Sequence, residues 1–247
     1  MGKLIKIEAD KSISCYLAEP ETQPRGAIIV IHEVWGLVDH IKSVADRLAQ
    51  EGFVALAPSL LEHSDFDSAA ITKLQEALFD PEKRNSVQPE LRKLMAPSQE
   101  PDFGELTIKR VKACFDYLYK QPEVNGKVAV IGFCFGGTYS FSLAVAEPRL
   151  ALALPFYGHT DQAVDELREI KCPIRAFYGE NDERLMSGLP DLTERMKEAG
   201  VNFVSKVYPN CGHAFFNDSN RFAYNEAAAE DAWVKVKSEL GQVMPAK

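Results

Sequence analysis

The sequence lacks the long apolar run, the basic patch and the leader segment that would place a protein in a membrane, on nucleic acid or outside the cell. None of its apolar stretches approaches the roughly 20 residues that cross a bilayer, and no signal-peptide core precedes Glu8 and Asp10. The 28 Lys and Arg residues are fewer than the 36 Asp and Glu residues and do not cluster. We therefore expect a cytoplasmic protein with neither a nucleic-acid nor a membrane partner.

Cysteine is also scarce. Five cysteines occur, an odd number, and none forms a CxxC pair: Cys15, Cys114, Cys134, Cys172 and Cys211. This pattern predicts neither a disulfide framework nor a zinc site, and we expect no metal or cofactor. With 247 residues, 46% of them hydrophobic, the chain can bury one large core without cross-links. The expectation is one domain, as a monomer or a small homo-oligomer.

Short apolar, β-branched runs alternate with helical patterns along most of the chain. The predicted strands are residues 3–8, 12–17, 27–32, 53–57, 127–131, 151–156, 174–178 and 202–208. The predicted helices are residues 39–51, 106–120, 138–147, 161–170, 189–199 and 222–240. Such alternation predicts an α/β fold with a mostly parallel sheet of about eight strands and helices on both faces.

Residues 59–103 interrupt this alternation. The stretch contains two helix-like pieces, residues 68–79 and 89–95, among four prolines at positions 81, 89, 97 and 101. Long connections in a compact domain usually form lids or binding loops. We interpret this stretch as a lid-like insertion within a single domain of residues 1–247.

The stretch of residues 132–137, Gly-Phe-Cys-Phe-Gly-Gly, lies where a predicted strand ends and a helix begins. A sharp strand-to-helix turn with a nucleophile at its apex is the nucleophile elbow, usually written G-x-S-x-G. Here the apex is Cys134. The positive end of the following helix would favour a thiolate and the oxyanion that forms on attack. The pattern therefore predicts a hydrolase with a thiol nucleophile; the alternative is a buried structural cysteine in a glycine-rich turn.

A thiol nucleophile requires a base, and two later loops offer one. In chain order this fold supplies nucleophile, acid and histidine. His213 follows the last predicted strand and would take the proton from Cys134, while Asp182, after the preceding strand, would orient the imidazole ring. Both loops follow the carboxyl ends of strands, where α/β sheets bind ligands. Glu180 and Glu183 compete with Asp182 for the orienting role.

The loop after the strand at residues 27–32 reads Glu33-Val34-Trp35-Gly36. In this fold that loop and the residue after the nucleophile donate the two N–H groups of the oxyanion hole, here the backbones of Val34 and Phe135. A carboxylate at Glu33 would oppose the oxyanion, but it could act as a second base for Cys134. The alternative reading is a solvated loop glutamate. Trp35 is a candidate for the pocket wall.

These motifs together resemble the dienelactone hydrolase (carboxymethylenebutenolidase) family of the α/β-hydrolase superfamily. The resemblance rests on residues 32–36, 132–137, 156–158, on Gly179 with Asp182, and on the run that begins at His213. It implies an α/β-hydrolase fold and a Cys134–His213–Asp182 triad with Glu33 near the thiol. It further implies that a substrate-triggered movement of the glutamate deprotonates the cysteine. The implied reaction opens a lactone through an acyl-enzyme, without metal or cofactor.

The chain departs from the family at the arginines that bind a substrate carboxylate and restrain the glutamate. The position a turn beyond the catalytic histidine holds Asn217, and Arg221 lies further along. In the altered stretch before residue 103, Arg84 and Arg92 are the candidates. The sequence therefore predicts a hydrolase of an enol-lactone or small ester. Two alternatives stay open: a broad carboxylesterase or thioesterase, and a non-catalytic, thiol-bearing pseudo-hydrolase.

Overall fold

The computed structural model describes residues 2–62, 67–80, 82–100 and 102–246. Its strands form one eight-stranded sheet in the order β1-β2-β4-β3-β5-β6-β7-β8. The strands are β1 (Lys3–Ile7), β2 (Ile13–Ala18), β3 (Ala27–Ile31), β4 (Val54–Pro58), β5 (Val128–Phe133), β6 (Leu152–Phe156), β7 (Ile174–Gly179) and β8 (Phe203–Tyr208). Strand β2 is antiparallel to both of its neighbours, and all other pairs are parallel. The predicted fold class and the antiparallel first hairpin are confirmed.

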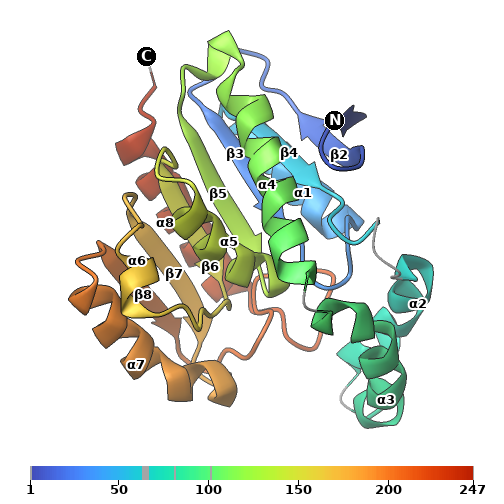
Figure 1. Ribbon diagram of the computed structural model, residues 1–247. Helices are drawn as coiled ribbons and strands as arrows, with labels where there is room; N and C mark the ends of the chain where they lie inside the picture. Colours follow the sequence, from blue (N-terminus) through green and yellow to red (C-terminus); the bar gives the residue numbers. More distant parts are fainter. Residues whose placement is uncertain (1, 63–66, 81, 101, 247) are drawn as a thin grey trace.

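Helices cover both faces of the sheet. In Figure 1, α4 and α5 lie in front of the central strands, and α1 and α8 lie behind them. The helices are α1 (Asp39–Gln50), α2 (Ser68–Phe79), α3 (Arg84–Leu94), α4 (Phe103–Tyr119), α5 (Phe135–Ala146), α6 (Val164–Leu167), α7 (Glu183–Glu198) and α8 (Glu226–Val243), with short 3-10 turns at Ala96–Gln99 and Pro122–Val124. This two-sided cover explains why β3, β5 and β6 consist of buried residues throughout.

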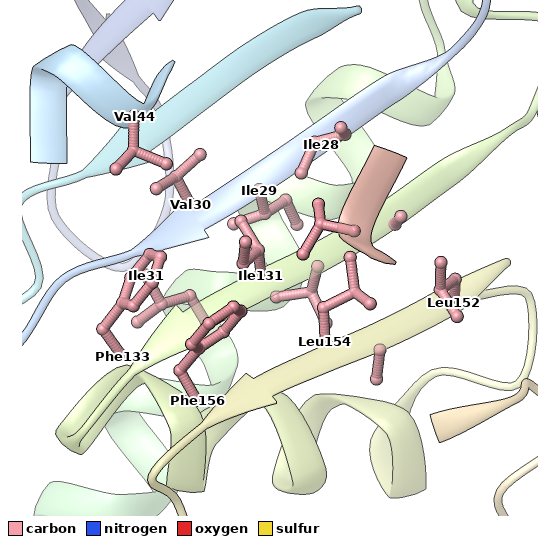
Figure 2. Close-up of a cluster of buried hydrophobic side chains, with 14 of the residues drawn as sticks. Ile28, Ile29, Val30, Ile31, Val44, Ile131, Phe133, Leu152, Leu154 and Phe156 are labelled. Carbon is pink, nitrogen blue, oxygen red and sulfur yellow. The ribbon is translucent and has the colours of Figure 1, made fainter. Parts of the chain in front are cut away.

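The core lies between the central strands and these helices. Figure 2 shows side chains of β3, β5 and β6 gathered with Val44 of α1 in one continuous apolar layer. Most of them are completely shielded from solvent, Ile29, Ile131 and Leu154 among them. Burying one such side chain contributes about 1.5–3 kcal/mol. The rigid sheet that results fixes the loops at its carboxyl edge, where the candidate site lies.

The segment between β4 and α4 carries α2, α3 and the 3-10 turn Ala96–Gln99. The helix pair α2–α3 projects from one side of the sheet (Figure 1). A second, small apolar cluster of Leu61, Ile71 and Phe103 joins this segment to the body, with Trp35 packed against it. The predicted helix at residues 68–79 is confirmed. The predicted helix at residues 89–95 instead begins five residues earlier, at Arg84.

Two helices begin earlier than predicted and contain a proline in their interior. The helix expected at residues 89–95 is the longer α3, which includes Pro89. The helix expected at residues 189–199 is the longer α7, which includes Pro190. Helix α7 begins at Glu183, directly after the loop of Asp182, rather than at residue 189.

Two further helix predictions were too long. The helix expected at residues 161–170 is only the single turn Val164–Leu167; Arg195 of α7 binds the carbonyl oxygens of Thr160 and Gln162 and so holds the preceding segment as a loop. The helix expected from residue 222 begins at Glu226, because Asn225 caps it by accepting a hydrogen bond from the Ala228 N–H at 3.0 Å. Other boundaries differ by at most three residues.

Candidate active site

The strand-to-helix turn at Cys134 connects β5 to α5. Cys134 adopts φ 55° and ψ −109°, a conformation that L-residues other than glycine rarely occupy. Gly132 lies so close to the turn that a Cβ there would sit 2.0 Å from the carbonyl oxygen of Gly136. The glycine spacing read in the sequence is therefore a steric requirement. The strained backbone holds Cys134 half-exposed at the carboxyl edge of the sheet.

The loops after β7 and β8 bring Asp182 and His213 together. The Asp182 Oδ2 atom lies 2.5 Å from the His213 Nδ1 atom, across 31 positions of sequence. Asp182 is buried at the start of α7, whereas 37% of the His213 side chain is exposed. The imidazole and the Cys134 side chain line the same pocket. The three predicted residues therefore lie in one array, in the order acid, histidine, thiol.

Charges in this array alter the proton affinity of both partners. Burial lowers the pKa of His213, but the negative charge of Cys134 and the hydrogen bonds to Asp182 and Cys134 outweigh it and raise that pKa to about 10. Burial raises the pKa of Asp182, and its hydrogen bond to His213 overrides this and leaves it below the usual value. The surroundings thus favour the protonated form of His213.

The backbone N–H groups of Val34 and Phe135 are the predicted oxyanion donors. Phe135 is the first residue of α5, so its N–H has no helical acceptor, and the hydrogen bonds found in the described part of the chain use neither it nor the N–H of Val34. His32 steadies this region: it binds the Glu33 carbonyl oxygen through Nδ1 at 2.6 Å and accepts from the Leu60 N–H at 3.0 Å. Burial lowers the pKa of His32 to about 4, so the ring is neutral. It stacks on the Phe135 ring.

Glu33 is a buried carboxylate, not a solvated one, with 2% of its surface exposed. Its Oε2 atom accepts a hydrogen bond of 2.5 Å from Asn217 Nδ2, and its Oε1 atom accepts one of 3.2 Å from the Tyr157 hydroxyl. Asn217 is itself completely buried, and its Oδ1 atom accepts from the N–H and hydroxyl of Ser219. Two neutral donors therefore hold the carboxylate.

Tyr157 is the site residue to which the sequence assigned no role. It follows β6 directly, at φ 38°, and its ring centroid lies 4.9 Å from that of His213. Burial raises the pKa of its phenol well above the usual value, and the charges of Glu33 and Cys134 add to this effect. Its position at the carboxyl end of a central strand was the available signal. Tyr157 therefore links the carboxylate to the thiol–imidazole array.

A pocket of about 260 Å³ opens over Cys134. One wall is apolar and comes from the β3 loop and the helix pair: Val34, Trp35, Leu78, Phe79 and Leu91. Trp35 meets Phe79 edge to face at a centroid distance of 5.3 Å, which joins the two sides of this wall. The polar lining includes Glu33, His213 and Arg84. We call this cavity the catalytic pocket.

The three arginines singled out in the sequence lie in different places. Arg84, at the start of α3, lines the catalytic pocket and donates a hydrogen bond from Nε to the Leu78 carbonyl oxygen. Arg92 is exposed and does not line the pocket, and Arg221 lies over the Phe222 ring at 4.8 Å, also outside it. Of the three arginines, only Arg84 therefore lines the pocket that also contains Cys134.

The other cysteines are buried. Cys114 lies on the inner face of α4 with Val111, Phe115 and Leu118, as predicted, and Cys15 and Cys172 pack in the same core. Cys211 is buried two residues before His213. Among the described residues, no group of three or more His, Cys, Asp or Glu side chains could hold a metal ion. None of the described helices is long and apolar enough to cross a membrane.

The sheet order, the strained turn at Cys134 and the loops that bring His213 and Asp182 to it define the class of protein: an α/β hydrolase. Within that class, residues 13–244 match the model of the Dienelactone hydrolase family. The chain belongs to that family. The resemblance stated from the sequence is thereby confirmed.

Relatives support the same family, and solved structures support the same fold. A "Putative carboxymethylenebutenolidase" of Saccharolobus solfataricus is 35% identical over 98% of this chain and 99% of its own length. The crystal structure of a "Putative Dienelactone Hydrolase" from Klebsiella pneumoniae has a TM-score of 0.81 at 23% identity, with 98% of each chain covered. The crystal structure of a dienelactone hydrolase from Anabaena variabilis has a TM-score of 0.71 at 16% identity. The chain is thus an ester-hydrolysing enzyme, and the non-catalytic alternative is not supported.

Proposed function

We propose that this enzyme opens an enol-lactone or a small ester through a thioester on Cys134. The observation that carries the proposal is the hydrogen-bonded Asp182–His213 pair, 2.5 Å apart, beside a thiol held at a strained turn. A nucleophile needs a base in contact with it and a third group that orients the base. His213, oriented by Asp182, is the acid for the leaving oxygen and, once neutral, the base for water, while Glu33 takes the proton of Cys134.

The reaction begins with attack of the Cys134 sulfur on the substrate carbonyl carbon. The N–H groups of Val34 and Phe135 stabilise the oxyanion. Removing one such donor would reduce this stabilisation by about 3 kcal/mol. His213 then gives its proton to the leaving oxygen as the C–O bond breaks. Its pKa of about 10 keeps that proton available at neutral pH. Water, activated by the neutral His213, hydrolyses the thioester.

Glu33 acts as a second base in this proposal. Its carboxylate is anchored by Asn217 and Tyr157, so taking the proton of Cys134 requires it to release at least one of these hydrogen bonds. Both donors are neutral, so no full charge attraction opposes the release. A substrate that displaces Glu33 from Tyr157 would thereby activate the thiol.

The catalytic pocket suits a small substrate that carries one anionic group. Arg84 provides the positive charge at its mouth, while Trp35, Phe79 and Leu91 provide an apolar wall. A lactone with a carboxylate fits this pairing of charge and apolar surface. The segment of residues 59–103 supplies Arg84 and part of the wall, and we propose that it serves as a lid over the substrate.

A second candidate function is that of a broad carboxylesterase or thioesterase. The apolar wall favours it, because Val34, Leu78 and Leu91 can contact an acyl chain without needing a carboxylate. Rates on dienelactone and on p-nitrophenyl esters of increasing chain length separate the two. The lactone hydrolase prefers the carboxylate-bearing substrate, whereas the broad esterase prefers the esters.

The nucleophile is tested by trapping the acyl-enzyme. Rapid quenching with either substrate, followed by peptide mass spectrometry, should place the acyl group on Cys134. The Cys134→Ala variant should lose turnover, while Cys211→Ala, at a buried cysteine two residues from His213, should keep most of it. Acylation at another residue, or equal activity of Cys134→Ala, overturns the proposal.

A further inference from the structure

A second pocket adjoins the catalytic pocket on the far side of His213. Its volume is about 570 Å³, compared with about 260 Å³ for the catalytic pocket, and the two share His213 and Arg84 as lining residues. The second pocket is lined by Asp182 but not by Cys134. We call it the outer pocket. The site is therefore one groove in two parts that meet at the imidazole.

The position of His213 decides which part of a substrate each pocket takes. The carbonyl carbon must lie at the Cys134 sulfur, within the catalytic pocket. The histidine that protonates the leaving oxygen must lie on the side from which that oxygen departs. The outer pocket extends from His213 away from the thiol, so it faces the alcohol part of an ester. The acyl part then lies against the apolar wall of the catalytic pocket.

The walls of the outer pocket are polar without an excess of either charge. Asn181, Asn210 and Asn225 present carboxamide groups. Asn181 and Asn210 are exposed, so their amides are available to a ligand. Of the charged groups that line it, Asp182 is paired with His213, and the remaining two, Glu183 and Arg84, are opposite in sign. Such a wall can donate hydrogen bonds to hydroxyl groups and accept them from hydroxyl groups.

Two exposed aromatic rings complete the outer pocket. Only five large apolar side chains in the described part of the chain are exposed, and Phe222 and Tyr224 are two of them, at 45% and 37%. Exposed rings gathered at one pocket mark a binding surface more often than chance exposure does. Arg221 covers one face of Phe222. A ligand with a C–H-rich face and hydroxyls at its edge, as in a sugar ring, matches rings and amides together.

We propose that the outer pocket binds the alcohol part of the substrate, and that this alcohol is an uncharged polyol or sugar. The inference rests on the proposed function of Cys134 and narrows its substrate to an ester whose alcohol departs. The sulfur forms a bond to the acyl carbon, the ester C–O bond breaks, and the proton of His213 goes to the departing oxygen. The sugar leaves as a neutral alcohol, and the acyl group remains as a thioester.

Three acetate esters test the alcohol preference. 6-O-acetylglucose has a polar ring, cyclohexyl acetate has an apolar ring of similar size, and ethyl acetate has almost no alcohol part. All three give the same acetyl-enzyme, so differences in kcat/KM report only binding and acylation. We expect kcat/KM for acetylglucose to exceed that for cyclohexyl acetate about tenfold. Equal values, or a preference for cyclohexyl acetate, overturn the inference.

Variants at the rings supply the second measurement. Phe222→Ala and Tyr224→Ala should lower kcat/KM for acetylglucose about fivefold to tenfold and leave ethyl acetate unchanged. Leu4→Ala, at a side chain of β1 that is 71% exposed, is the matched control and should change neither rate. If both ring variants lower kcat/KM equally for acetylglucose and for ethyl acetate, the outer pocket is not an alcohol site.

The two proposals fail in different ways. If all three esters acetylate Cys134 at rates that do not depend on their alcohol part, only the proposed alcohol site is overturned. Absence of acetylated Cys134 after quenching with every ester overturns the thioester mechanism and the alcohol site with it. Acetylated Cys134 together with the expected preference supports both.

Discussion

Asn217 donates a hydrogen bond of 2.5 Å from Nδ2 to Oε2 of Glu33, across 184 positions of sequence, and both side chains are buried. The carboxylate at the first loop is thus tied to the loop that carries His213. The amide replaces the cation that the resemblance to the family led us to expect at this position. Among the described residues, the hydrogen bonds to the Glu33 carboxyl group come from two neutral side chains, Asn217 and Tyr157.

Glu33→Gln separates the base role from folding. The amide keeps an oxygen for Asn217 and a donor for the Tyr157 oxygen, so we expect the free energy of unfolding to change by less than about 1 kcal/mol. Pre-steady-state acylation at neutral pH should slow far more than this change in stability implies. Stopped-flow acylation and urea denaturation measure the two effects. An unchanged acylation rate rules out Glu33 as a base.

Asn217→Asp places a second carboxylate against Glu33. Like charges at this distance raise the pKa of one carboxyl, so one proton is shared at acid pH. The shared proton stabilises the fold below that raised pKa, and the stability falls as pH rises through it. Tm measured from about pH 5 to about pH 8 should fall more steeply than in the wild type. Asn125→Asp, at an exposed turn, adds the same charge and should show no such slope.

The pKa of His213, about 10, sets a second pH dependence. Because it is raised from 6.5, the ion pair stabilises the fold fully below about pH 6.5, and this contribution is lost as pH rises through about 10. An NMR titration of the imidazole should give this value in the wild type and a lower one in Cys134→Ala, which removes the side chain that raises it. His32, with a pKa of about 4, is the internal control. An unchanged pKa in the variant would show that Cys134 does not raise the pKa of His213.

Arg84 and Arg92 lie on the same helix, but only Arg84 lines the catalytic pocket. Arg84→Gln should raise KM for a carboxylate-bearing lactone about tenfold or more, since a charge-assisted hydrogen bond contributes about 1.5–3 kcal/mol. KM for a neutral ester should change little. Arg92→Gln is the matched control and should leave both KM values unchanged. Equal effects of the two substitutions would exclude Arg84 as the carboxylate ligand.

Much of the fold could be predicted because each central strand is a continuous apolar run that must be buried on both faces. The errors fall where tertiary contacts outweigh local preference. Helices α3 and α7 begin earlier than predicted, and each contains a proline in its interior. The helix expected at residues 161–170 is reduced to the single turn Val164–Leu167, which follows a segment held by Arg195. Local propensity is weaker than these contacts.

The candidate site also contains residues that could be predicted from the sequence and residues that could not. Cys134, His213 and Asp182 could be identified because the fold requires a nucleophile, an acid and a histidine in a fixed chain order. The role of Tyr157 and the choice among three arginines could not, since both depend on which side chains meet across the sheet edge. For Asn217, the sequence showed only that an asparagine stands where the family resemblance implies an arginine.

The sequence by itself determined the class of this protein. The spacing of glycines around Cys134 is compatible with one turn geometry. The order of the apolar runs is compatible with few sheet topologies. The tertiary structure alone decided how Glu33 is held, which arginine lines the catalytic pocket, and that a second pocket lined by Phe222 and Tyr224 also includes His213. The reason is physical: strands and turns follow from local sterics and burial, whereas a binding site is made by loops that meet only after the sheet has formed.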